Sequence, residues 1–415
     1  MANTLINSTL LSKQAAAYFK LNNTFIATAN RQYDGMFSDN TYDAGQTINI
    51  RLDNQHIVQR GDAVTASDIK ETYLPLTLQD LYTVYVNYST VDLSTTLRYN
   101  TWKERVLLPA VQNIIADINK DIAAAAANSI YLTTGTPGSS INTFAEVDIA
   151  GAILAEQGVD QGKDWFFAIN HRDGSALKTA LQNSFNTTLN KEISFGSRMG
   201  KLSYFDFYYD QSIARHQSYT GDYGTPVVNG AVSSGNSIVA SGFTGSITGI
   251  LKQGDVIEIT HDTLQPYFVN RVNKVNTGQY AQFVVTADAD SSAGGAVTIP
   301  VSPTINIDTS DPNQNLSGAI PDGATITVIR KGTVADGLDG LQNVNLAYSS
   351  SGLYAVCPPL EKLDGQDSST FTDPETGWSL RVSKGSDIAN NVNQLRIDVL
   401  CGYLWIPSQA VRVVS

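Results

Sequence analysis

The stretch that decides the fold is Leu97–Asn128, which reads LRYNTWKERVLLPAVQNIIADINKDIAAAAAN. Its large apolar residues recur at steps of three and four positions, and this spacing places them on one face of a helix. They are Leu107, Val111, Ile114, Ile115, Ile118 and Ile122. Polar residues fall on the opposite side, namely Asn113, Asp117, Lys120 and Asp121. The pattern predicts one long helix with a single buried face, a spine helix that supports the sheets.

A proline interrupts this stretch and limits how straight the helix can be. At about 1.5 Å per residue, an unbroken helix over the whole stretch would be more than roughly 40 Å long, which is unusual in a compact domain. The ring of Pro109 would clash with the carbonyl oxygen of Arg105. We therefore expect a kink or a restart of the helix near Pro109.

The residues before the spine helix alternate with a period of two, which indicates β-strands. Alternation runs from Thr47 to Leu52 and again from Leu74 to Leu78, and the mostly polar stretch Asp53–Glu71 joins the two runs. A third alternating run, Tyr82–Tyr88, leads toward the spine helix. A long polar connection of this kind usually works outside the domain core, so we predict an extended hairpin arm.

Residues 1–34 are polar with scattered apolar positions and are predicted to form an N-terminal arm. Ala15–Ala17 favour a short helix within this arm. Its apolar residues need a surface to lie on, either one of this chain or one of a neighbour. The sequence leaves both possibilities open.

The pattern after the spine helix is of the α/β type. Thr133–Asn142 is a turn region rich in glycine, proline and serine, and Val147–Glu156 is predicted to be a helix. Asp164–Asn170 is a short apolar strand, His171–Gly174 a polar turn, and a helix is expected from Ala176. Strand, tight turn and helix together form an α/β element.

The stretch 221–345 differs in character, because glycine and serine rise and helical periodicity is lost. Short β-type runs separated by turns predict a small barrel or sandwich inserted into the α/β part. The runs are Ser237–Ala240, Asp255–Thr260, Tyr267–Val275, Tyr280–Thr286, Ala296–Val301 and Ala324–Arg330. The α/β part is expected to resume near Leu346, and we expect the insert to fold alone.

The C-terminal residues are predicted to be strands again. Apolar positions alternate in one run from Leu395 to Trp405, a turn follows at Pro407, and Ala410–Val414 forms a final strand. Cys357 and Cys401 lie in apolar, strand-like surroundings, which favours two buried thiols over a disulfide.

Composition excludes few classes of protein. The chain has 415 residues, 42% of them hydrophobic, and a formal net charge of −12. This balance argues against a dedicated nucleic-acid binder, which would carry a basic face. No apolar run is long enough for a membrane helix, and Met1–Ser8 lacks the pattern of a secretory signal. These features are typical of a cytoplasmic protein.

Two short motifs resemble catalytic or metal sites and are rejected. His171-Arg172-Asp173 copies the start of the kinase catalytic loop, but Lys178 stands where that loop needs asparagine. Asp288–Gly294 resembles the start of a calcium loop, but Ile299 stands where the bidentate glutamate belongs. A polar turn is the simpler interpretation of both.

Other signals of chemistry are also missing from the sequence. Leu202 follows Gly200-Lys201 where a phosphate loop needs serine or threonine. The histidines are not spaced as metal ligands, and they are His56, His171, His216 and His261. We therefore expect no catalytic, cofactor-binding or metal-binding residue, and a protein that works by contacting copies of itself.

Several segments together resemble a known family. They are Gly45–Leu52, Val84–Leu93, Trp165–Asn170, Leu251–Ile259, Gly377–Ile388 and Asn393–Tyr403. In this order they resemble the major capsid proteins of tailed bacteriophages with the Hong Kong 97 fold. They are most similar to the P-twenty-two-type coat proteins, which carry an inserted β-barrel. The loop Val228–Ser237 departs from some relatives, being short and uncharged, so a salt bridge carried by that loop is not expected.

The resemblance implies an α+β chain with four parts. They are an N-terminal arm (1–40), an extended β-hairpin loop (41–92), a capsid core (93–220 and 346–415) and an inserted barrel (221–345). It also implies pentamers and hexamers of an icosahedral shell around double-stranded DNA, a scaffolding protein, a portal protein and a precursor shell that expands. The location would be the virion, after assembly in the cytoplasm of a bacterial host.

Three alternatives belong to other functional classes. An encapsulin-like compartment protein would share the fold, but the inserted barrel and the lack of a cargo signal argue against it. A glycan-binding or adhesive β protein is disfavoured by the long helix and the missing secretory signal. A hydrolase built on scattered carboxylates has no residues at catalytic spacing.

Overall fold

The computed structural model describes most of the chain and places it in two compact units. The described residues are 8–21, 24–33, 47–62, 69–79, 81–89, 103–182, 201–330, 332, 340–373, 377–387 and 389–415. Unit 1 comprises Met1–Ile50, Pro75–Ile122 and Leu353–Leu404, and unit 2 comprises Arg51–Leu74, Ala123–Gly352 and Trp405–Ser415. None of the helices in the described part of the chain combines the length and the apolar character of a membrane span.

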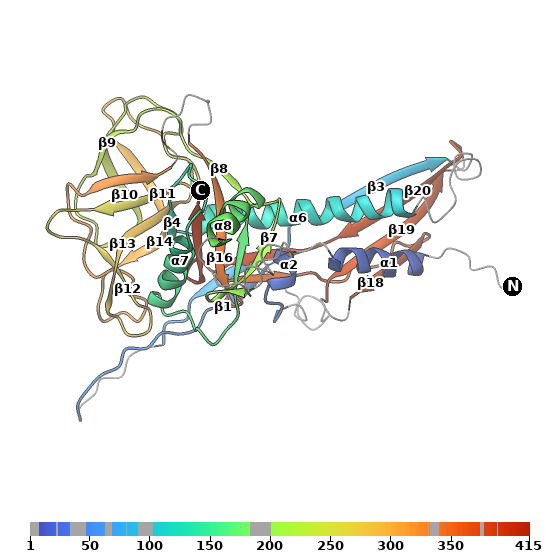
Figure 1. Ribbon diagram of the computed structural model, residues 1–415, viewed down its shortest axis with the longest axis horizontal. Coiled ribbons are helices and arrows are strands. Elements are labelled where there is room, and N and C mark those ends of the chain that lie inside the picture. The colour runs from blue at the N-terminus through green and yellow to red at the C-terminus, as the bar shows by residue number, and fades with distance from the viewer. Residues whose placement is uncertain are drawn as a thin grey trace. The chain divides into compact units, whose positions relative to one another are not determined.

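Unit 1 contains a four-stranded antiparallel sheet in the order β18-β19-β20-β3. Its strands are β3 (Tyr82–Ser89), β18 (Asp367–Thr372), β19 (Ser379–Asp387) and β20 (Val392–Val399). The N-terminal helix α1 (Ser8–Leu21) packs along β18 and β19 (Figure 1). The third alternating run of the sequence is therefore a strand of this sheet rather than part of the hairpin.

The spine helix is present, and its predicted buried face is confirmed. A π-helical segment, η1 (Lys103–Leu107), leads directly into α6 (Leu108–Ser129), so the helix changes from π to α geometry one residue before Pro109, near the predicted kink or restart. All six apolar residues assigned to the buried face are at most 4% exposed. Asn113, Asp117 and Lys120 are exposed on the other side. The beginning of the predicted stretch, residues 97–102, lies outside the described residues.

Short secondary-structure elements lie at the root of the hairpin. Strands β1 (Thr47–Arg51) and β2 (Tyr73–Thr77) form a two-stranded sheet, as the alternation predicted. Strands β17 (Leu353–Val356) and β21 (Gly402–Trp405) form another, and α2 (Phe25–Thr28) is a single helical turn.

The single strand expected from Leu395 to Trp405 is wrong. Strand β20 ends at Val399 and β21 begins at Gly402, and the two strands join different sheets. Between them, the Gln79 N–H donates to the Cys401 carbonyl at 2.8 Å. A Cβ on Gly402 would lie 2.8 Å from the Thr77 carbonyl oxygen, so glycine is needed where the chain passes the hairpin strand.

Unit 2 is built on a second sheet, which runs β4-β22-β16-β5-β7-β6, with β8 also paired to β16. Its strands are β4 (Thr133–Gly135), β5 (Trp165–Ile169), β6 (Lys201–Leu202), β7 (Phe205–Tyr209), β8 (Arg215–Gln217), β16 (Leu341–Ser349) and β22 (Ala410–Val414). Helices α7 (Phe144–Glu156) and α8 (His171–Gln182) follow the predicted α/β pattern, and the 3-10 turn η2 (Pro407–Gln409) precedes the last strand.

Three boundaries in this unit differ from the sequence prediction. The polar turn at His171–Gly174 is wrong, because α8 already begins at His171 and the Asn170 side chain caps it by accepting from the Arg172 N–H at 3.0 Å. The predicted turn region Thr133–Asn142 opens with β4, which pairs in parallel with β22. The core sheet resumes at Leu341, with β16, rather than near Leu346.

The insert forms a closed ring of six antiparallel strands in the order β11-β15-β9-β10-β14-β13, and β13 pairs back to β11. They are β9 (Gly224–Val228), β10 (Ser234–Phe243), β11 (Val256–Thr260), β13 (Asn276–Val285), β14 (Val297–Asn306) and β15 (Thr325–Ile329). A seventh strand, β12 (Tyr267–Val269), pairs with β13. Closure removes the open edges of the sheet, which is how small barrels avoid edge pairing.

The sequence located most of these strands but missed one and overextended another. Strand β9 contains Gly224 and Pro226, which weaken a strand signal. The run expected to reach Val275 stops at Val269, because the Asn270 side chain accepts from the Val272 N–H at 2.8 Å and closes a turn.

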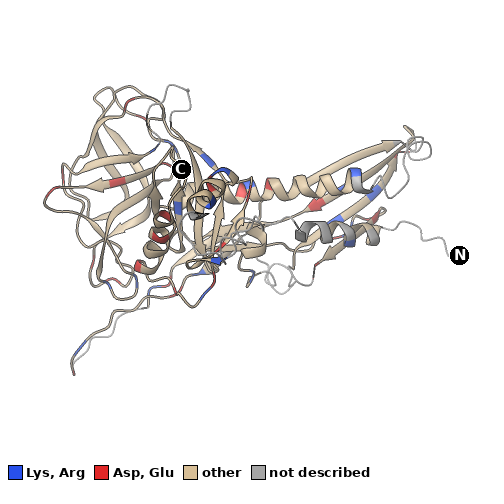
Figure 2. Cartoon of the chain, viewed as in Figure 1, with Lys and Arg blue, Asp and Glu red and all other residues tan. Residues whose placement is uncertain are grey.

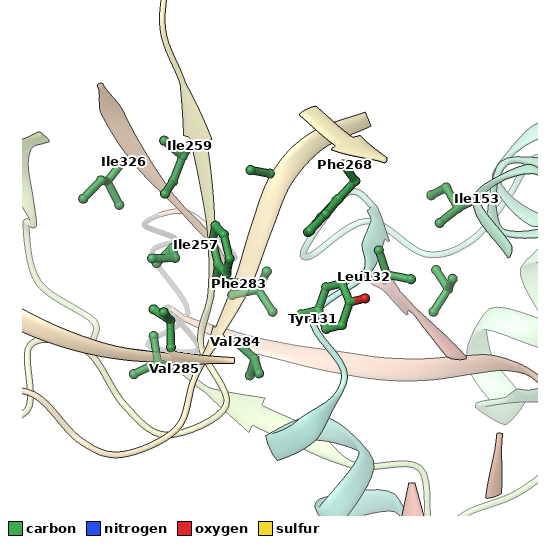
Figure 3. Packing of buried hydrophobic residues seen from close by; sticks show 14 of the residues in the cluster. Tyr131, Leu132, Ile153, Ile257, Ile259, Phe268, Phe283, Val284, Val285 and Ile326 are labelled. Carbon is green, nitrogen blue, oxygen red and sulfur yellow. The ribbon is translucent and has the colours of Figure 1, made fainter. Parts of the chain in front are cut away.

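The barrel and the α/β sheet of unit 2 share one hydrophobic core (Figure 3). Phe283 and Ile257 are completely buried inside the barrel. Phe268 lies at its edge and meets Tyr131 of the α/β part, with ring centroids 5.4 Å apart. Ile153 of α7 continues the same cluster on the far side of Tyr131. The insert is therefore packed onto the core of its own unit.

Candidate assembly surfaces

The root of the hairpin is fixed by a small buried cluster in unit 1. Ile50 and Leu76 are completely buried and Val356 is 1% exposed. The hydroxyl groups of Thr47 and Thr77 lie 3.0 Å apart across the two strands. The hairpin is thus anchored at its base by side chains that point inward.

Beyond the root, the hairpin exposes most of its residues. The Leu52 N–H donates to the Thr72 carbonyl at 2.9 Å, and residues 53–62 are then mostly exposed. Val58 is 85% exposed and Ile69 is 66% exposed. Residues 63–68 lie outside the described part of the chain. Apolar side chains displayed on an extended arm are candidates for burial against a partner.

Surface charges stabilise the hairpin only weakly. Arg51 lies 3.9 Å from a carboxylate oxygen of Glu71, and its guanidinium lies 5.8 Å from the centre of the Tyr73 ring. The Tyr73 hydroxyl also donates to Glu71. Exposed pairs of this kind contribute about 0–1 kcal/mol. The direction of the hairpin therefore depends on what it lies against.

The described part of the predicted N-terminal arm packs on its own chain. Leu11 and Ala15 of α1 are completely buried, and the Ser8 hydroxyl donates to Asp367 at 2.7 Å. Phe25 of α2 is also completely buried, and the Asn30 N–H donates to the Leu353 carbonyl at 2.8 Å. Of the two surfaces that the sequence left open, this arm uses the one of its own unit.

A polar groove lies between β3 and the spine helix in unit 1. The cavity has a volume of about 640 Å³, and Tyr82, Asn113, Asp117 and Asp121 are among the residues that line it. The Tyr82 hydroxyl donates to Asp121 at 2.7 Å. Burial, followed by this hydrogen bond, raises the pKa of Tyr82 well above its usual value, so the phenol stays neutral.

A buried polar cluster joins the barrel to the core of unit 2. Arg412 is completely buried and donates through Nη1 to the carbonyl oxygens of Ala127 at 3.0 Å and Gly254 at 2.8 Å. Asp255 accepts from the Ser218 hydroxyl at 2.5 Å and lies 2.8 Å from His216 Nε2. Burial lowers the pKa of Arg412 to about 10, although the nearby Asp255 raises it. Sequence reasoning missed this cluster, because its members come from distant parts of the chain.

The two rejected motifs have structural roles among the described residues. Asp173 is buried and accepts from the Ser415 hydroxyl at 2.7 Å and from the Asn345 side chain at 2.9 Å. The Asp288 carboxylate accepts from the Gln253 N–H at 2.8 Å, which closes a barrel loop. Within the described ranges, no group of three acidic, histidine or cysteine side chains could hold a metal ion.

The two cysteines are buried and free, as predicted. The Cys357 thiol donates to the Ser379 carbonyl at 3.2 Å. Burial, with a further contribution from Cys357, raises the pKa of Cys401 well above its usual value. Neither thiol is therefore a reactive group.

Lysines and arginines are interspersed with aspartates and glutamates over the described elements (Figure 2).

The sequence of the chain matches a known family model and a known protein, and these matches indicate its class. A family model described as "P22 coat protein - gene protein 5" matches residues 232–413, which include most of the barrel and the return to the core. The major capsid protein of Acyrthosiphon pisum secondary endosymbiont phage 1 is 26% identical over 322 residues, which cover 72% of this chain and 72% of that relative. The two matches confirm the class predicted from the sequence, a major capsid protein of a phage. Within this class, the chain is similar to the coat proteins of the P22 type.

Solved structures give more remote similarities. A chain of Mycobacterium phage Che8 has a TM-score of 0.46 and 10% identity, and the match covers 94% of this chain and 90% of that one. The capsid of Ralstonia phage GP4 has a TM-score of 0.46 and 8% identity, with 96% of this chain and 90% of that one covered. The class rests on the two sequence matches, which favour it over the encapsulin-like and glycan-binding alternatives.

Proposed function

We propose that the protein assembles through pentamers and hexamers into the icosahedral shell of a tailed phage, around double-stranded DNA. The observation that carries this proposal is the contrast within the hairpin. Its root is held by the fully buried Ile50 and Leu76, whereas Val58 further along is 85% exposed. A strand pair that is fixed at its base and open along its length is suited to lie on a neighbouring copy.

The proposed architecture is the Hong Kong 97 fold with an inserted barrel. The long one-faced spine helix, the hairpin and the closed ring of strands support this assignment. The proposed parts are those predicted from the sequence, with two changes. Strand β3 (Tyr82–Ser89) belongs to the sheet of unit 1 rather than to the hairpin, and the insert ends before β16 begins at Leu341. In this fold the protein acts structurally, and we propose no catalytic step, cofactor or metal for it.

The proposed partners follow from the way a shell must be built. Each subunit gains only a few weak contacts with each neighbour, and closure makes the whole shell persistent through multivalency. We propose that a scaffolding protein guides assembly in the host cytoplasm and that a portal protein occupies one vertex. The precursor shell would expand when DNA enters, and the mature protein would reside in the virion.

Electron microscopy of the protein made together with its scaffolding partner tests this proposal directly. Negative staining should show closed shells of uniform diameter that sediment far ahead of free subunits. A preparation that stays monomeric, or that forms only irregular aggregates, would contradict the proposed function.

A further inference from the structure

One loop of the barrel, residues 308–315, is held in a fixed shape. The Asp311 N–H donates to the Asp308 carbonyl at 3.0 Å, and the Asn315 side chain donates to the Thr304 carbonyl at 2.7 Å. The ammonium group of Lys274 donates to the carbonyl oxygens of Pro312 and Gln314 in the loop. The loop therefore presents its outward side chains without needing to reorganise.

The returning leg of the hairpin, residues 69–72, docks on this loop. Lys70 Nζ lies 2.9 Å from Asp311 Oδ2, and the Asn313 amide donates to the Thr72 hydroxyl at 3.4 Å. The Asp311 side chain is only 16% exposed, whereas that of Lys70 is 52% exposed. Both contacts join parts of unit 2 that are more than two hundred residues apart in sequence.

The carboxylate of Asp311 is ready to hold a cation. Burial alone would raise the pKa of Asp311, but the Asn313 N–H and the Lys70 ammonium donate to the carboxylate and hold its pKa below the ordinary value. The group is therefore ionised at neutral pH.

The seam under the docked leg is not closely packed. A cavity of about 470 Å³ lies there, and its lining includes Leu52 and Leu74 of the hairpin together with Phe268 of the barrel. A space of this size is not filled by interlocked side chains. The contacts that hold the leg include a half-exposed ion pair and a long hydrogen bond, which are among the weaker contacts in proteins.

We propose that barrel loop 308–315 is a docking surface for the subunit's own hairpin, and that the Lys70–Asp311 contact must open before the hairpin can reach a neighbouring copy. The inference rests on the proposed function in shell assembly. In the free subunit the contact holds the returning leg of the hairpin against the barrel. A neighbour that binds the hairpin only in its released state shifts the equilibrium toward release.

A reversible crosslink tests both halves of the proposal. Lys70→Cys and Asp311→Cys are combined, and the two thiols are joined in free subunits by a short, reductively cleavable bis-maleimide. We expect an intramolecular link in most subunits and loss of shell formation, with shells restored to the level of the untreated variant after cleavage. The single variants Lys70→Cys and Asp311→Cys, treated with the same reagent, are matched controls and should keep assembling.

Each other outcome of the crosslinking experiment overturns part of the proposal. Linked subunits that assemble as well as untreated ones would show that the contact need not open. Thiols that take up reagent separately, without linking, would show that the leg is not docked. If the wild-type chain forms no shells, the proposed function is wrong, and the proposed release of the hairpin is wrong with it. The crosslink in free subunits would still show whether the hairpin is docked on the barrel.

Charge reversal gives an independent test of the same contact. Lys70→Asp should release the hairpin and raise the initial rate of shell assembly severalfold. The swapped pair, Lys70→Asp with Asp311→Lys, should return the rate to that of the wild-type chain. Equal rates for all three proteins would overturn the proposal.

Discussion

The barrel and the hairpin are both made of antiparallel strands with alternating side chains, yet they differ in what the alternation buries. In the barrel, Ile257, Phe283 and Ile299 are completely buried within a closed ring. In the hairpin, Ile50 and Leu76 are buried at the root, and the chain beyond them is mostly exposed. Alternation therefore identifies a strand, but it does not say whether the packing partner belongs to the same domain.

The difference has a direct energetic consequence. A closed barrel satisfies its own backbone hydrogen bonds and shields its own core. A two-stranded hairpin is marginal by itself in water, so its course is set by surfaces such as the loop that holds Asp311. We infer that the barrel contributes stability and the hairpin contributes contacts with other subunits.

Removal of residues 1–34 should have the largest effect on the protein, because this segment is expected to contribute both to the stability of the subunit and to contacts with other subunits. An arm that lay only on neighbouring copies would leave, when deleted, a folded subunit that fails to form shells. The structure adds a loss of stability, since Leu11, Ala15 and Phe25 are completely buried in unit 1. We expect a lower unfolding temperature by circular dichroism and no closed shells by sedimentation.

Two other results of this deletion would change the comparison between the barrel and the hairpin. Intact shells from the truncated chain would show that the segment makes no essential contact with neighbours. A chain that is unfolded at room temperature would show that the segment, like the barrel, is part of the subunit's own fold.

The spine helix should behave like the barrel and unlike the hairpin. Ile118→Ala should lower the free energy of unfolding by about 2–5 kcal/mol, because Ile118 is completely buried and truncation leaves a cavity. The same range is expected for Ile114→Ala. Asn113→Ala, on the exposed side of the same helix, is the matched control and should change little. Equal losses in urea unfolding would mean that the buried face is assigned wrongly.

The sequence predicted the spine face and most barrel strands because both depend on local periodicity. Ile114 and Ile118 are one helical turn apart, and Ile257 and Ile259 are two residues apart in a strand. The spacing within each pair therefore indicates which face is buried. The break after Val399 could not be found in this way, because alternation continues through Cys401. At this point Gly402 passes close to the hairpin strand, a contact between residues far apart in sequence that the local pattern does not indicate.

Contacts between distant residues explain the rest of what sequence reasoning missed. Lys70 and Asp311 meet across the chain, and nothing in the residues next to either one indicates the other. The same holds for Arg412, which reaches the carbonyl oxygens of Ala127 and Gly254. The candidate surfaces of this protein are therefore set by tertiary packing rather than by motifs.

A smaller effect is expected when the barrel is removed from its surroundings. The core sheet resumes with β16 at Leu341, so the segment to express is residues 221–330. It should melt cooperatively and give dispersed amide signals, with a loss of about 1.5–3 kcal/mol for uncovering Phe268. Phe268→Ser in the isolated segment should recover solubility without loss of the fold. A disordered spectrum from both proteins would show that the barrel depends on the core.

The smallest effect on stability is expected at the exposed part of the hairpin, and it separates the two regions most clearly. Val58→Ser removes an apolar side chain that is 85% exposed and contributes little to its own fold, so the free energy of unfolding should change by less than about 0.5 kcal/mol. If the hairpin lies on a neighbour, the same change removes apolar contact at every copy of that interface, and repetition around a closed shell multiplies a small loss. Shell yield should fall while the unfolding curve of the free subunit stays in place. Thr263→Ser, on an exposed barrel loop, is the matched control and should alter neither quantity. A fall in stability without a fall in yield would assign Val58 to the subunit's own fold and remove the distinction between the two regions.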